Sequence, residues 1–188
     1  IADNPDEAYE EGLRWAEAGK RPAARVCVAL ALIALGQEEE GALRLEELAN
    51  SPDAGGLDAR AVYLAQAGNA WLVAGAPEAA IVTLTNALKL APRDAAIHVD
   101  RARAHMTMKS WDLAGGDLDR ALEISPGDAE ALHLRAVALT ESGRLEDAWD
   151  DVKAAMRADP RNVEVLVLRG GVREAMHAAG MKDPEGLE

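Results

Sequence analysis

Apolar residues recur at every third or fourth position over much of the chain, which is the period of an amphipathic helix. Leu132, Ala136 and Leu139 follow this period within residues 129–141, and a second apolar run follows it within residues 145–158. A glycine separates the two runs. The pattern predicts two helices joined by a tight turn, with small residues on the facing sides that let the helices approach closely.

The end of each such pair is marked by a proline. Pro92, Pro126 and Pro160 lie 34 residues apart, and proline does not continue a helix comfortably because it lacks an N–H donor. A residue suited to cap the next helix follows two positions after each proline, because its side-chain oxygen accepts from first-turn N–H groups. These caps are Asp94, Asp128 and Asn162. A fixed period of this length is typical of a repeat array.

Eight positions of each period resemble the signature of the tetratricopeptide repeat, and the chain as a whole resembles a bacterial-type array of such repeats. The signature places bulky, bulky, small and bulky residues in a first helix, then alanine, a bulky residue, alanine and proline. The first clear repeat fills it with Leu64, Ala67, Gly68, Trp71, Ala80, Leu84, Ala87 and Pro92. The resemblance implies an all-α fold, an α-α superhelix in the form of a right-handed solenoid of antiparallel helix pairs.

The spacing divides the chain into four parts. Residues 1–57 are expected to form degenerate helices or one repeat-like unit, and residues 58–162 to form three clear units at 61–94, 95–128 and 129–162. Residues 163–180 are expected to form the first helix of a partial or capping repeat, and residues 181–188 a tail. Helices are also expected over 5–18, 22–35, 38–50 and 163–177. Because the last helix is apolar on several sides, we expect that it packs on a neighbouring chain or that the natural protein continues.

Composition narrows the function classes. The net charge of −13 argues against a nucleic-acid partner, since phosphate binding needs clustered Lys and Arg. Residues 1–55 hold 12 acidic against 5 basic residues, so the acidity is concentrated at the amino end. The low aromatic content of 3% agrees with packing through alanine and leucine.

Cys27 is the single cysteine, which excludes an intrachain disulfide framework, and no cofactor is expected. The apolar run around it is too short to span a bilayer. The chain begins at Ile1, so both the cytoplasm and, if an N-terminal signal was removed, the periplasm stay open as compartments.

The histidines are the candidates for chemistry. His98 and His105 lie seven residues apart with Arg101 between them, whereas helical metal ligands prefer closer spacing and further Cys or carboxylate partners. Both fall at bulky packing positions, so packing is favoured over a metal site or catalysis. The glycine pairs 115–116 and 170–171 are expected to permit close helix packing.

Charged residues also keep the period of 34. Arg101, Arg135 and Arg169 recur at an inward-leaning position, and Asp117 and Asp151 recur on the second helices. Buried charges are tolerated only when they are paired and hydrogen-bonded. The spacing therefore predicts a ladder of Arg–Asp pairs that fixes helix register.

In the tetratricopeptide family, the first helices line a concave groove that binds peptides. The resemblance implies that the groove holds Val62, Gln66, Asn69, Leu72, Val99, Asp100, Arg103, Met106, Glu130, His133 and Val137. Asn69 matches one position of the clamp that some members use for a terminal carboxylate, but Ala65, Asp100 and Glu130 replace polar or basic members, which disfavours that specialisation.

Three functions follow, in decreasing order of support. The first is a non-enzymatic adaptor or scaffold that binds a protein or peptide in the groove. The second is a self-associating structural module of a larger assembly, with residues 163–180 forming the contact. The third is an enzyme whose chemistry depends on His98 or His105.

Overall fold

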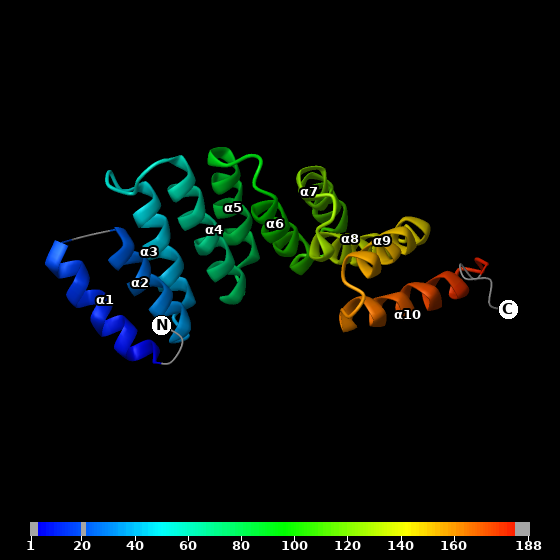
Figure 1. Ribbon diagram of the computed structural model, residues 1–188, viewed down its shortest axis with the longest axis horizontal. Helices are drawn as coiled ribbons and strands as arrows, with labels where there is room; N and C mark the ends of the chain where they lie inside the picture. Colours follow the sequence, from blue (N-terminus) through cyan, green and yellow to red (C-terminus); the bar gives the residue numbers. More distant parts are fainter. Residues whose placement is uncertain (1–3, 20–21, 183–188) are drawn as a thin grey trace. The chain divides into compact units, whose positions relative to one another are not determined.

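The computed structural model describes residues 4–19 and 22–182, and within these ranges the only regular secondary structure is α-helix (Figure 1). The helices are α1 (Pro5–Gly19), α2 (Pro22–Ala34), α3 (Glu38–Asn50), α4 (Leu57–Val73), α5 (Pro77–Leu90), α6 (Ala95–Thr107), α7 (Trp111–Ile124), α8 (Ala129–Glu141), α9 (Leu145–Ala158) and α10 (Val163–Ala178). The all-α prediction is confirmed. None of these helices is long and apolar enough to cross a bilayer.

The helix starts that the sequence predicts are confirmed by their hydrogen bonds. Asp94 Oδ1 accepts from the N–H groups of the second and third residues of α6. Asp128 Oδ1 does the same at α8 and Asn162 Oδ1 at α10. Each of these side chains satisfies donors that the first turn of a helix leaves without an intrahelical partner.

The helices pack into two compact units, and the division falls inside α6, after Ala104. In the first unit, each helix from α1 to α4 packs against the helix that follows it. In the second unit, α8 packs against α7 and α9, and α10 packs against α9 and α8. Contacts between successive helices are typical of repeat proteins. The repeat boundaries 61–94, 95–128 and 129–162 stay a prediction.

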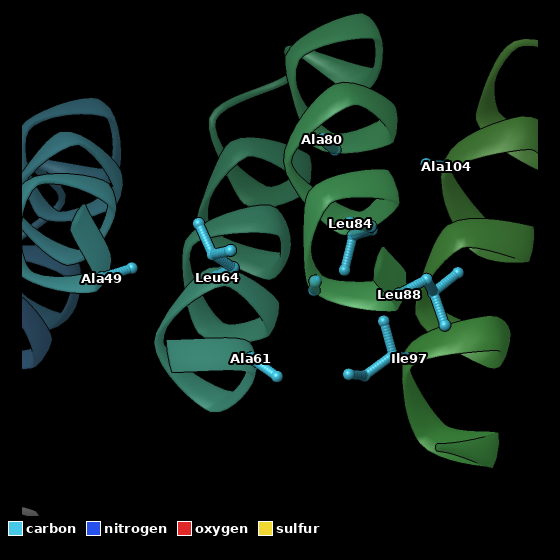
Figure 2. Close-up of a cluster of buried hydrophobic side chains, with 9 residues drawn as sticks. Ala49, Ala61, Leu64, Ala80, Leu84, Leu88, Ile97 and Ala104 are labelled. Atoms are coloured by element: carbon cyan, nitrogen blue, oxygen red, sulfur yellow. The ribbon is translucent and has the colours of Figure 1, made fainter. Parts of the chain in front are cut away.

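The core of the first unit is built from leucines that lie against alanines. Leu84, Leu88 and Ile97 lie together where α5 meets α6 (Figure 2), and all are buried. Ala80 and Ala87 on α5 are fully buried as well. Small residues at these positions let neighbouring helices approach closely, which explains why alanine rather than an aromatic residue fills the signature.

Glycines play two different roles in the helices. A Cβ on Gly68 would lie 2.5 Å from Leu84 Cγ, so this position demands the absence of a side chain. By contrast, a Cβ on Gly115, Gly116, Gly170 or Gly171 would meet no atom within 4 Å. The expectation that these two glycine pairs permit close helix packing is therefore wrong for the described residues, because none of their atoms comes within 4 Å of an added Cβ.

The last helix is apolar on more than one side, as expected. Val165, Val172 and Met176 are buried. Val163 and Val167 are 69% and 71% exposed, and Leu166 is 44% exposed. One flank of α10 therefore packs on its own unit and another presents apolar side chains to the surroundings.

Candidate functional site

Three of the predicted groove residues form a polar cluster on the first helices of the first unit. Asn69 lies on α4, and Asp100 and Arg103 lie on α6. The Asn69 amide donates from Nδ2 to Asp100 Oδ2 at 2.9 Å, and the Arg103 guanidinium donates to Asp100 Oδ1 at 2.8 Å. Both Asp100 oxygens are thus engaged. The cluster joins two first helices that lie about 30 residues apart in the chain and leaves Arg103 as its accessible cationic group, with 38% of the side chain exposed.

The other predicted residues of this unit differ in accessibility. Val62 is 49% exposed, and Leu72 is half-buried. Gln66 carries a buried Oε1 atom that accepts no hydrogen bond. Val99 is only 4% exposed and belongs to the packed interior. It therefore does not offer its side chain to a ligand, because the turn of the helix that carries Asp100 outward carries Val99 inward.

The second unit carries the remaining predicted residues. Met106, His133 and Val137 are half-buried, and Glu130 is exposed. His133 Nδ1 lies 3.8 Å from an oxygen of the exposed Glu164 carboxylate. This unit therefore presents a half-buried surface of mixed polarity on its first helices.

Of the two histidines at packing positions, His98 is buried and His105 is half-buried. His98 is 8% exposed, and its Nε2 atom lies 3.3 Å from the backbone oxygen of Pro92. His105 Nε2 lies 3.8 Å from Asp117 Oδ2, with 13% of its side chain exposed. Among the described residues, no three His, Cys, Asp or Glu side chains gather as a metal ion would require.

The Arg–Asp ladder is confirmed in the third repeat. Arg135 of α8 donates to both carboxylate oxygens of Asp151 on α9, each at 2.7 Å, and from NH1 to Asp119 on α7 at 2.6 Å. Asp151 is 7% exposed, and its hydrogen bonds raise the pKa of the Arg135 guanidinium above its usual value. This cation therefore ties a first helix to two second helices. Arg101 donates to the Thr85 hydroxyl of α5 at 3.1 Å, and its pairing with Asp117 stays a prediction.

Sequence reasoning missed a second polar junction in the first unit. Glu46 of α3 accepts hydrogen bonds from Trp71 Nε1 on α4, at 3.0 Å, and from the Thr83 hydroxyl on α5. Thr83 is 3% exposed. Little in the sequence indicated this junction, because Glu46 lies outside the clear repeats and is one of several acidic residues on α3. The junction is structural, since it joins three successive helices through one carboxylate.

The comparisons with known proteins agree with this architecture. Residues 72–136 match the family model described as tetratricopeptide repeat. Mouse sperm-associated antigen 1 is 32% identical over 95 residues, which cover 50% of this chain but only 10% of that protein. The chain thus spans a small part of the curated relative that it matches.

Solved structures of similar fold share less sequence. The second tetratricopeptide domain of human RPAP3, solved in complex with the HSP70 peptide SGPTIEEVD, has a TM-score of 0.60 at 22% identity and covers 62% of this chain and 98% of its own. MamA 41-end from Desulfovibrio magneticus RS-1 has a TM-score of 0.68 at 19% identity, covering 86% and 94%. Together with the 34-residue period and the paired helices, these structures show the fold of a tetratricopeptide-repeat array, and the family match shows tetratricopeptide-repeat sequence over residues 72–136.

Proposed function

We propose that this chain is a protein-interaction module that holds a peptide segment of a partner against the first helices of its repeats. The observation that carries the proposal is the polar cluster of Asn69, Asp100 and Arg103, together with the exposed Val62 on the helix that carries Asn69. Exposed apolar side chains and an oriented cation on the first helices of one unit suit an extended or helical peptide, because the apolar contacts give affinity and the charge fixes the register. No enzymatic role is proposed, since His98 and His105 are engaged in packing contacts.

The test is affinity capture from a lysate of the native organism, with the captured proteins identified by mass spectrometry. Arg103→Glu is expected to lose the main captured protein, because the substitution places a second carboxylate beside Asp100. Arg120→Glu is the matched control, since Arg120 is 64% exposed on the second helix α7. Unchanged capture by the Arg103→Glu variant would place the binding surface elsewhere.

The cluster also predicts which peptides this surface rejects. The related RPAP3 domain was solved with a peptide that ends in Glu-Glu-Val-Asp. Here the Asn69 amide already donates to Asp100, and the Asp100 carboxylate repels a further carboxylate. Isothermal titration with SGPTIEEVD is therefore expected to show a dissociation constant above about 1 mM. Micromolar binding would contradict this account of the cluster.

A further inference from the structure

In the part of the chain that the structure describes, one flank of α10 is more exposed than its counterpart in the preceding repeat. Leu132 of α8 and Leu166 of α10 stand 34 residues apart, at the same position of the repeat. Leu132 is 6% exposed on a helix against which α9 packs, whereas Leu166 is 44% exposed. Within residues 4–19 and 22–182, the flank of α10 around Leu166 is therefore more open than the corresponding flank of α8.

A hollow of about 380 Å³ lies beside this open flank, between α9 and α10. It is lined by Trp149, Val152, Lys153, Met156, Arg157 and Arg169. Val152 and Trp149 form a buried apolar floor, with exposures of 0% and 5%. These six residues and Leu166 are called the terminal seat, because they lie where the second helix of a further repeat would pack.

The terminal seat differs from its counterpart in the third repeat by one reversed charge. There, Arg135 is held between Asp119 and Asp151. In the terminal seat, 34 residues further on, Lys153 stands at the position of Asp119 and Arg169 at that of Arg135. Two cations thus occupy positions where the third repeat has an acid–base pair, in a chain whose net charge is −13.

The other cation of the seat, Arg157, lies one turn beyond Lys153 on α9. Lys153 forms an exposed ion pair with Asp150 at 2.7 Å, a kind of pair that contributes little and exchanges easily. Arg157 makes no ion pair within the part of the chain that the structure describes. The seat therefore favours a helix that brings apolar side chains together with carboxylates.

Helix α1 has the matching chemistry. It carries five carboxylates against one arginine, and its main packing partner is α2. Glu7, Glu11 and Trp15 are spaced four residues apart, so they lie along one face of the helix, and all three are exposed. Trp15 is 39% exposed, which is unusual for so large an apolar side chain.

We propose that the terminal seat binds α1 of a second copy of this chain. Glu7 and Glu11 are separated by one helical turn, as are Lys153 and Arg157, so two antiparallel helices pair both carboxylates with both cations at once. Trp15 then supplies apolar cover for the flank around Leu166. The contact joins two different surfaces, so copies associate head to tail.

The test is sedimentation velocity of the 188-residue chain over a range of concentrations. Association that grows with concentration and weakens when the salt rises from about 0.05 to about 0.5 M is expected, because exposed charge pairs are screened by salt. A monomer at every concentration would overturn the proposal, and so would association that salt strengthens.

Charge reversal identifies the two surfaces. K153E/R157E reverses the seat, and E7K/E11K reverses α1. Each variant alone is expected to raise the dissociation constant by about tenfold or more. An equimolar mixture of the two is expected to restore association, since each seat then meets an α1 of opposite charge. Circular dichroism confirms that each variant is folded, and the restoration itself cannot come from a chain that has unfolded.

Two outcomes of the reversal experiment would contradict the contact. A mixture that stays monomeric would show that α1 does not occupy the seat. Arg103→Glu serves as a control from the proposed peptide surface and is expected to leave association unchanged. Loss of association in that variant would place the contact between copies on the first helices instead, and this result is separate from the loss of partner capture.

Discussion

At the scale of single residues, side-chain size on the facing sides of the helices decides whether the two helices of a repeat can pack against each other. Gly68 faces Leu84, which is fully buried. The same signature position holds alanine at 102 and 136, and both are fully buried. The scarcity of aromatic residues follows from these positions, because each bulky side chain that packs needs a small one opposite it.

Gly68→Ala is therefore expected to destabilise the protein by about 1–2 kcal/mol. The steric cost of an added methyl group in a filled site exceeds the gain of roughly 1 kcal/mol that alanine brings to a helix interior. The free energy of unfolding in urea measures it. Gly115→Ala is the matched control, expected to stabilise by about 0.5–1 kcal/mol because no atom lies near the added methyl. Equal effects of the two substitutions would contradict this packing argument.

At the scale of the helices, a few polar contacts fix how neighbouring helices align. Arg135 joins α8 to both α7 and α9, and Glu46 joins α3 to α4 and α5. Apolar packing between alanine-rich helices is tolerant of small shifts along the helix axis. A two-point hydrogen bond, such as that from Arg135 to Asp151, does not tolerate such shifts, because its donors and acceptors align in one register only.

Arg135→Ala and Asp151→Ala are expected to couple. Removing either partner leaves the other partly buried charge without its two-point bond, so the double variant should lose about 1–3 kcal/mol less than the sum of the single losses. Urea unfolding of the four proteins in the cycle measures this coupling. The exposed pair Arg120 and Glu123 is the control and should show almost none. Strictly additive losses of stability for Arg135→Ala and Asp151→Ala would show that this pair does not fix the alignment of the helices.

Glu46→Ala tests the second junction. The substitution leaves the buried Thr83 hydroxyl and the Trp71 indole N–H without their acceptor, at an expected cost of about 1–3 kcal/mol. Glu47→Ala, one residue further along the same helix, is a surface comparison for which a change within about 0.5 kcal/mol is expected. If Glu46→Ala were as mild as Glu47→Ala, the hydrogen bonds to Glu46 would contribute nothing to stability.

At the scale of the whole molecule, stability should vary along the array, because each helix depends on its neighbours. Helix α4 packs against α3 and α5, whereas α1 packs mainly against α2. Stability in such arrays is close to a sum of repeat and interface contributions. Helices with one neighbour open by local fluctuation more readily than helices with two.

Amide hydrogen exchange is therefore expected to be slowest in α3 and α4, which each have two neighbouring helices, and fastest in α1. The measurement is made at a dilution at which copies of the chain do not associate. Repeating it at high concentration adds a second expectation, since α1 and α10 should gain protection if α1 fills the terminal seat. Uniform protection along all helices of the dilute protein would contradict the dependence on neighbours.

The sequence by itself determined the fold class, the bounds of the six helices for which ranges were predicted (to within one residue), the N-caps and the inward arginines. It could do so because a 34-residue period exposes the positions at which sterics admit only small residues or prolines. The pairing of Arg135 with Asp151 was foreseeable for the same reason, because both residues keep the period.

Only the tertiary structure decided which positions meet a neighbour and which stay open. The glycines at 115 and 170 follow the same local pattern as packed glycines, yet no atom of the described residues comes within 4 Å of a Cβ added to them. Val99 and Asp100 are adjacent in the chain, but one is buried and the other anchors a polar cluster. Such distinctions depend on contacts between helices far apart in sequence, which a local periodicity does not contain.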